Sequence, residues 1–148
     1  MPRKLNISLR PQTALTVTRV RTNSDRMVYV FVANKPLLYK WGNKRHKSRI
    51  AYIGVSQRGL RRLTESVRER AEEILSKHGV RSFEVRVVTC KGKKHVRTWE
   101  QLEDGFLNTF KREFGSLPIC NTKEPGDSSA FENHFNPKRI REVIRQLS

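Results

Sequence analysis

One stretch of thirteen residues, AYIGVSQRGLRRL at 51–63, constrains the fold more than any other part of the chain. It begins with an apolar, β-rich run that predicts a strand, and the glycine of its YIG triplet allows a close backbone approach. From Gln57 onward the pattern becomes helical, and the first turn carries three arginines. A strand that brings Tyr52 toward a helix start rich in guanidinium groups is typical of an anion-binding site.

Hydrophobic periodicity divides the rest of the chain into further strands and helices. Strands are predicted at Thr13–Val20, Met27–Ala33 and Phe83–Cys90. Helices are predicted from Arg58 to His78, from Thr98 to about Phe114, and from Pro137 onward behind an Asn136 cap. Residues 122–130 are rich in Pro, Gly and Ser and are predicted to form a mobile loop.

The charge of the chain is strongly positive and unevenly placed. Lys and Arg number 31 against 14 Asp and Glu, which gives a formal net charge of +17 over 148 residues. Ten of these cations lie between Arg26 and Thr64, where no acidic residue occurs. A surplus of this kind in one small domain predicts a polyanionic partner.

The segment from Asn34 to Arg49 is basic and contains Pro36 and Gly42, so we predict an irregular loop. Two interpretations of its Trp41 stay open. The aromatic ring stacks on nucleic-acid bases while the surrounding cations meet phosphates, or it packs a long hairpin loop onto the body of the protein. The candidate nucleic-acid contacts are Lys40, Trp41, Lys44, Arg45, Lys47 and Arg49, followed by Arg58 and Arg61 in the first turn of the next helix.

The second predicted helix carries one carboxylate in an apolar stripe. Thr98 and Gln101 form a capping-box pattern at its start. At about 100° per residue, Glu103 projects from the middle of the apolar stripe, whereas Glu100 and Asp104 point away from it. Because an unpaired buried charge is costly, Glu103 is expected at the edge of a pocket, in contact with an arginine, a metal ion or a hydrogen-bond donor. A structural ion pair and a functional role are both open here.

No run of eighteen apolar residues and no apolar signal core occur in the sequence. We therefore expect neither a membrane span nor secretion, and a cytoplasmic location, or a nuclear one in a eukaryote. The two cysteines, Cys90 and Cys120, form no CxxC pair and are expected to be small buried hydrophobes.

Several of these features, in this order, resemble the GIY-YIG nuclease family. They are VYV at 28–30, YIG at 52–54 with Ser56, Arg62 ten residues after Tyr52, Glu103 in a helix, and Asn121 after Pro118. The resemblance covers residues 27 to 122. The second motif is intact, and the first keeps only its tyrosine, Tyr29.

The length of 148 residues predicts a single domain, and the resemblance implies an α+β fold for it, with a small, about three-stranded antiparallel sheet flanked by helices. By their own residue patterns, residues 1–26 are expected to add an N-terminal strand, and residues 123–148 a loop and a final helix. The resemblance also implies a divalent-metal-dependent cut of a phosphodiester, most readily in double-stranded or branched DNA. Tyr29 and Tyr52 would line the site, Arg62 would neutralise the phosphate, Glu103 would be the only protein ligand of one Mg²⁺ or Mn²⁺, and Asn121 would brace the surroundings of Glu103.

The chain departs from the family at two positions. Val55 stands where several relatives have a lysine, and Ser66 stands where homing-type relatives have a histidine. A phenol has a reference pKa of about 10, so Tyr52 as a general base needs a pKa that is depressed by Arg62 or by the metal ion. The alternative function is a non-catalytic basic module that binds nucleic acid, RNA included. Whether two copies pair as a homodimer to cut both strands stays open.

Overall fold

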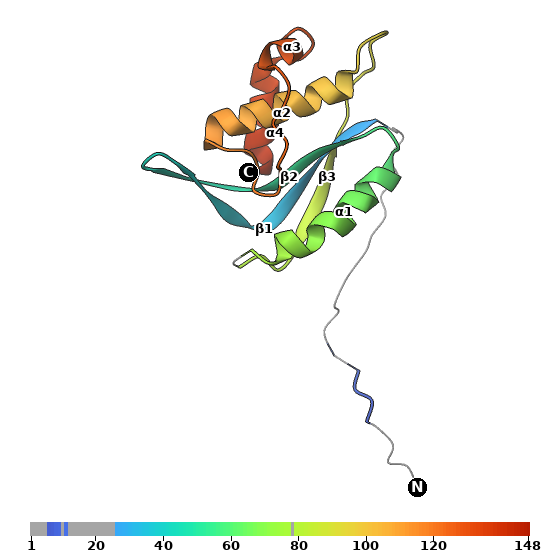
Figure 1. Ribbon diagram of the computed structural model, residues 1–148, viewed down its shortest axis with the longest axis vertical. Helices are drawn as coiled ribbons and strands as arrows, with labels where there is room; N and C mark the ends of the chain where they lie inside the picture. Colours follow the sequence, from blue (N-terminus) through green and yellow to red (C-terminus); the bar gives the residue numbers. More distant parts are fainter. Residues whose placement is uncertain (1–5, 10, 12–25, 78) are drawn as a thin grey trace.

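The protein folds around a three-stranded antiparallel sheet in the order β2-β1-β3, seen in a computed structural model that describes residues 6–9, 11, 26–77 and 79–148 (Figure 1). The strands are β1 (Met27–Trp41), β2 (Lys44–Ser56) and β3 (Phe83–Val88). The helices are α1 (Leu60–Leu75), α2 (Thr98–Phe114), α3 (Ser128–Glu132) and α4 (Pro137–Leu147). The expected α+β fold with a small antiparallel sheet flanked by helices is confirmed. The strand predicted at Thr13–Val20 lies outside the described residues.

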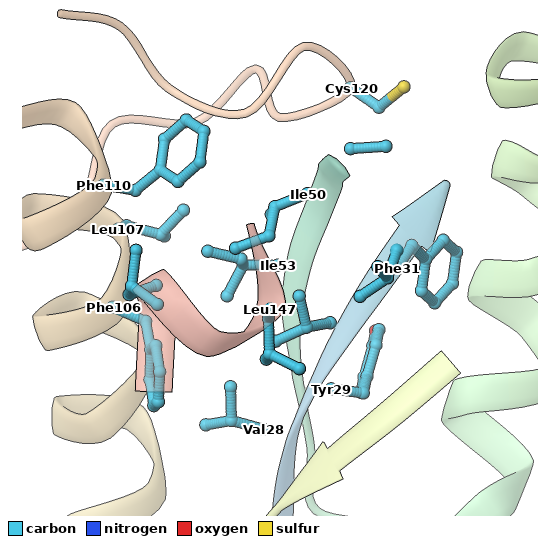
Figure 2. Packing of buried hydrophobic residues seen from close by; sticks show 14 of the residues in the cluster. Val28, Tyr29, Phe31, Ile50, Ile53, Phe106, Leu107, Phe110, Cys120 and Leu147 are labelled. Carbon is cyan, nitrogen blue, oxygen red and sulfur yellow. The ribbon is translucent and has the colours of Figure 1, made fainter. Parts of the chain in front are cut away.

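β1 is the central strand, and its first seven residues are all buried. This is the pattern of a strand that is covered on both faces, and in Figure 1 α1 covers one face while α2 and α4 lie on the other. Figure 2 shows Tyr29 and Phe31 between the sheet and α1. Val28 and the β2 residue Ile53 point to the other side, toward α2. The alternation of β1 side chains therefore builds two separate packing layers.

The segment from Asn34 to Arg49 is not an irregular loop, and that prediction was wrong. β1 and β2 continue as a paired hairpin as far as Trp41 and Lys44, which lie opposite each other in the register. The breakers are accommodated at two places: Pro36 lies where the register between Val32 and Leu37 is interrupted, and Gly42 occupies the turn with φ 56°. Proline is tolerated at such interruptions because no ladder hydrogen bond is required of it there.

The helix ends follow the predicted signals in part. Asn136 caps α4 by accepting a hydrogen bond from the backbone N–H of Lys138, as predicted. The capping box predicted for α2 does not form, because Thr98 lies within the helix and its hydroxyl donates to the carbonyl of Lys91 at 3.3 Å. The segment 122–130 is not entirely a loop, since α3 begins at Ser128.

The outer edge of β2 is covered by residues that follow α2. The backbone N–H of Cys120 donates to the carbonyl of Ala51 at 2.9 Å. Farther along β2, the backbone N–H of Arg49 donates to the carbonyl of Ser148 at 3.3 Å. Cys120 is fully buried there, as expected, whereas Cys90 is only partly buried. Closing the edge in this way removes unpaired backbone groups that would otherwise invite strand pairing with another chain.

Within the part of the chain that the structure describes, no helix is both long enough and apolar enough to span a membrane.

Candidate functional site

Tyr29 is the most enclosed member of the candidate site. It projects from β1 toward α1, and its hydroxyl lies 2.6 Å from the hydroxyl of Ser66 on that helix. On its other side the ring lies against the backbone of Gly54, where a Cβ atom would stand 2.6 Å from the ring. Burial raises the pKa of Tyr29 to about 12, although the Ser66 hydrogen bond acts in the opposite direction. Tyr29 is therefore a neutral phenol near physiological pH.

Tyr52 lies on the same face of the sheet and is half-buried. Its ring centroid is 6.2 Å from that of Tyr29 and 5.3 Å from that of Phe31. The guanidinium carbon of Arg70 lies 5.1 Å above the centroid of the Tyr52 ring, a cation–π distance. We expected Arg62 to act on Tyr52, but the contacting cation is Arg70.

Sequence reasoning missed Arg70, although a signal for it was present. Arg62, Ser66 and Arg70 are spaced four residues apart, and residues at that spacing share one face of a helix. α1 places this row toward the two tyrosines, with Ser66 in contact with Tyr29 and Arg70 over Tyr52. Ser66 and Arg70 therefore belong to the site.

Arg62 is the first residue of this row and lies in the first turn of α1. Its side chain is 41% exposed and forms two long ion pairs, at 3.6 Å to Glu65 and 3.9 Å to Glu69. Its positive charge lowers the pKa of Tyr29, against the larger effect of burial, so the guanidinium and the phenol are within electrostatic range. The two acidic partners hold Arg62 only weakly, because exposed ion pairs contribute little to stability.

Glu103 is half-buried on α2, in the apolar stripe that the sequence predicted. Its carboxylate forms no hydrogen bond or ion pair with any other described residue, so the predicted arginine partner is not present among them. Burial, reinforced by the negative charge of Asp104, raises the pKa of Glu103 to about 7, and Lys123 opposes this increase. The negative charge of Glu103 also contributes to the raised pKa of Tyr29, which places the two groups within electrostatic range.

The two other carboxylates of this helix segment have different environments. Glu100 accepts a hydrogen bond from the side-chain amide of Gln57 at 2.8 Å and pairs with Arg97 at 3.4 Å. Asp104 does not simply point into solvent as expected: it is half-buried and accepts the backbone N–H of Gly126 at 3.0 Å. The carboxylates of Glu100 and Asp104 therefore both bind other residues of the protein, whereas that of Glu103, between them in the sequence, binds no described residue.

Asn121 binds the edge of β2 and has no hydrogen bond to Glu103. Its side-chain oxygen accepts the backbone N–H of Ile53 at 2.9 Å, and its side-chain nitrogen donates to the carbonyl of the same residue at 2.8 Å. Asn121 therefore completes the pairing of β2 beside Tyr52 and Gly54. It positions the YIG strand, whereas the expectation was that it braces the surroundings of Glu103.

The candidate nucleic-acid contacts separate into different environments. Trp41 is 53% exposed, but it packs so closely against Gly115 at the end of α2 that a Cβ atom on Gly115 would overlap the Trp41 side chain. Arg61 is exposed and pairs with Glu65 at 3.7 Å. The remaining members are exposed apart from the half-buried Arg49, and they form no ion pair with other described residues: Lys40, Lys44, Arg45, Lys47, Arg49 and Arg58.

The described residues contain no group of three or more His, Cys, Asp or Glu side chains placed to hold a metal ion. A site with one protein carboxylate is nevertheless compatible with Mg²⁺, which keeps several waters and is commonly held by one or two carboxylates together with substrate phosphates. Glu103, whose carboxylate has no partner among the described residues, fits that donor set.

Tyr29 thus connects the candidate residues: its ring contacts that of Tyr52, and the charges of Arg62 and Glu103 both act on its pKa. No family model, no curated protein and no solved structure matches the chain.

Proposed function

We propose that this protein is a divalent-metal-dependent endonuclease that hydrolyses phosphodiester bonds, most readily in DNA. The observation that carries the proposal is the environment of Glu103. A half-buried carboxylate with a pKa raised to about 7 and no partner among the described residues lies within electrostatic range of Tyr29, which Arg62 also reaches. Perturbed carboxylates without a structural partner are typical of functional sites. The residues match in type and order those of the GIY-YIG nucleases that the sequence resembles.

Glu103 is the residue that would hold the Mg²⁺ or Mn²⁺ ion. When bound, such a cation stabilises the negative charge that develops on phosphoryl oxygens during hydrolysis. The proton bound to Glu103 below its pKa competes with metal binding, so the carboxylate is ready for a cation only as the pH approaches and passes about 7.

The other residues contribute binding, orientation and proton control. On substrate binding, Arg62 would exchange its long contacts to Glu65 and Glu69 for a phosphate group. Two oxygens of the phosphate can accept two charge-assisted hydrogen bonds from the guanidinium. Tyr29 is held by Ser66 and remains protonated, so its hydroxyl can orient a neighbour but cannot act as a base near pH 7. Tyr52, which is only half-buried, is the tyrosine whose hydroxyl can reach an attacking water.

The two departures from the family are consistent with this division of roles. Ser66 does not substitute for a histidine in proton transfer, because its hydroxyl is engaged with Tyr29 at 2.6 Å. Val55 is half-buried next to Gly54 and supplies no charge. Proton transfer therefore depends on Tyr52, and the guanidinium of Arg70 over its ring supplies positive charge beside it.

The test is the nicking of supercoiled plasmid DNA with Mg²⁺ or Mn²⁺, comparing the wild type with Glu103→Gln and Glu100→Gln. The first substitution removes a charge from the candidate metal ligand, and the second removes the same charge one turn earlier on the same helix, where Gln57 and Arg97 already bind it. We expect Glu103→Gln to lower the cutting rate at least 100-fold and Glu100→Gln to lower it less than threefold. Equal cutting by the wild type and Glu103→Gln would refute the site, and absence of cutting on plasmid, branched DNA and RNA would refute the activity.

A non-catalytic nucleic-acid-binding role is the second candidate, because the cations of the β1–β2 hairpin form no ion pairs with described residues. The two functions differ in their relation to metal. If the protein is a metal-dependent nuclease, Mn²⁺ should raise the melting temperature of the wild type, because a ligand that binds the folded state stabilises it. This increase should be lost in Glu103→Gln. A binding module requires salt-sensitive binding with no dependence on metal.

A further inference from the structure

The outer part of the β1–β2 hairpin, residues 37–48, has two faces of opposite character. We call it the hairpin arm. Paired residues in the arm are Leu38 with Lys47, Tyr39 with His46, and Lys40 with Arg45. Because successive side chains of a strand point to opposite faces, each pair shares one face and neighbouring pairs alternate. Figure 1 shows the arm projecting at the left of the molecule.

One face of the arm packs against the end of α2. The ring of Tyr39 meets that of Phe110 at 5.1 Å in an edge-on contact, and His46 meets Phe114 at 6.2 Å. The hydroxyl of Tyr39 also donates to the carbonyl of Ile50 at 2.6 Å. Trp41 lies on this same face, against Gly115. The aromatic residues of the arm therefore pack it against the end of α2.

The opposite face carries Leu38, Lys40, Arg45 and Lys47, all of them exposed. Lys40 and Arg45 are directly opposite each other in the register, an arrangement of like charges that costs stability. Neither these two nor Lys47 forms an ion pair with another described residue, whereas Arg61, Arg62 and Arg70 on α1 all have acidic partners. A like-charge cluster that the protein does not neutralise is suited to an external anion.

The cationic face continues toward the candidate site. Arg45, Lys47 and Arg49 occupy alternate positions of β2, so they form a row on one face with steps of about 6.8 Å, twice the strand rise. A register irregularity between Phe31 and Val32 then shifts the alternation, and Tyr52 falls on the same face as the row. DNA presents one phosphate per 3.4 Å of axis on each strand, so each step of the row spans about two phosphates.

We infer that this face of the hairpin arm is a docking surface for the phosphate backbone of double-stranded DNA, with Lys40, Arg45 and Lys47 as its contacts. The inference rests on the proposed function and names its substrate class. The surface favours a duplex over a single strand because recognition of single strands relies on aromatic platforms that stack on bases. Within residues 37–48 this face carries no aromatic side chain, since Tyr39 and Trp41 belong to the other face, and Tyr52 lies farther along β2.

The test is binding of a fluorescently labelled duplex, and of its isolated strand, measured by anisotropy without metal over a series of KCl concentrations. The variant is Lys40→Gln, Arg45→Gln and Lys47→Gln combined. The control removes three cations from the helices on the opposite side of the sheet, with Arg112→Gln, Lys138→Gln and Arg139→Gln combined. Circular dichroism and melting temperature check that both proteins are folded.

We expect the arm variant to lose affinity for the duplex on the order of 100-fold near 0.15 M salt, and its salt slope to fall by about three, because each phosphate contact contributes about 0.9 to that slope. The control should keep the wild-type slope. Wild-type preference for duplex over single strand should disappear in the arm variant. Equal duplex binding by arm variant and wild type, or a wild-type preference for the single strand, would overturn the inference.

Plasmid nicking separates this result from the proposed function. If the wild type cuts DNA but the arm variant binds duplex like the wild type, the docking surface is refuted and the nuclease stands. If no cutting occurs but the arm variant loses duplex binding, the nuclease is refuted and the docking surface stands.

Discussion

Gly54 and Tyr29 face each other across β1 and β2 so closely that a Cβ atom on Gly54 would lie 2.6 Å from two ring carbons and the hydroxyl oxygen of Tyr29. Real Cβ atoms do not approach other atoms to this distance, so a side chain at position 54 would displace the tyrosine. The hydroxyl of the same tyrosine is also held by Ser66. The glycine of YIG is thus required by the tyrosine of the neighbouring strand.

Substitution Gly54→Ala should destabilise the protein by roughly 1–3 kcal/mol, the usual cost of overpacking a core. Urea denaturation measures the change. Gly92→Ala is the matched control, because a Cβ there would meet no atom within 4 Å. Equal stability of Gly54→Ala and the wild type would show that Tyr29 is free to move.

Tyr29 should make stability fall at alkaline pH. Because burial raises its pKa from 10.0 to about 12, the folded state favours the protonated phenol. This contribution is fully present below pH 10 and is lost as the pH rises from 10 toward 12. Tyr29→Phe should therefore lose less stability over that range. At pH 7 it should be less stable by about 1 kcal/mol, since Ser66 loses its hydrogen-bond partner.

Denaturant unfolding at a series of alkaline pH values measures this difference. Tyr39→Phe is a useful comparison, because burial also raises the pKa of Tyr39. Parallel stability curves for wild type and Tyr29→Phe above pH 10 would contradict the buried environment of Tyr29.

Glu103 should make the wild type less stable as the pH rises through the neutral range. Its pKa is raised from 4.5 to about 7 by burial, so the folded state favours the protonated carboxyl. The stabilisation is complete below about pH 4.5 and is lost by about pH 7 and above. Glu103→Gln should abolish this dependence and be more stable than the wild type at pH 8 by roughly 1–3 kcal/mol. Unfolding in urea at pH 5 and pH 8 tests this, with Glu100→Gln expected to follow the wild type.

Asn121→Leu should destabilise the protein by roughly 2–4 kcal/mol, because it leaves both backbone groups of Ile53 without their partner. Hydrogen exchange at the Ile53 amide should become faster by a matching factor. Asn121→Asp keeps the acceptor and loses the donor, so its stability should lie between those of the wild type and Asn121→Leu. Unchanged exchange at Ile53 in Asn121→Leu would contradict the positioning role.

Local pattern was sufficient for most elements of the fold. The apolar run of β1, the alternation of β3 and the stripes of α1, α2 and α4 each reflect burial on a face that the backbone period determines. The hairpin arm was missed because Pro36 and Gly42 are local breakers, whereas the pairing that overrides them is contributed by a strand farther along the chain. The capping box failed for a similar reason, since Thr98 bonds to Lys91 and not within its own helix.

The sequence predicted which residues belong to the candidate site better than it predicted which of them contact one another. The position of Glu103 in an apolar stripe was visible from helical periodicity alone. The pairing of Arg70 with Tyr52, and of Asn121 with Ile53, was not visible, because these partners are 18 and 68 residues apart and meet only through packing of helices and loops on the sheet.

The sequence by itself determined which residues are apolar, where the charges lie, and that a strand carrying Tyr52 runs into a helix carrying Arg62 and Ser66. These are consequences of local periodicity, which short segments already contain. Tertiary structure decided that Ser66 engages Tyr29, that Glu103 finds no partner among the described residues, and that the cations of the arm gather on one face. Those outcomes depend on register and on helix placement, which arise only when the strands pair and the helices bury their apolar stripes against them.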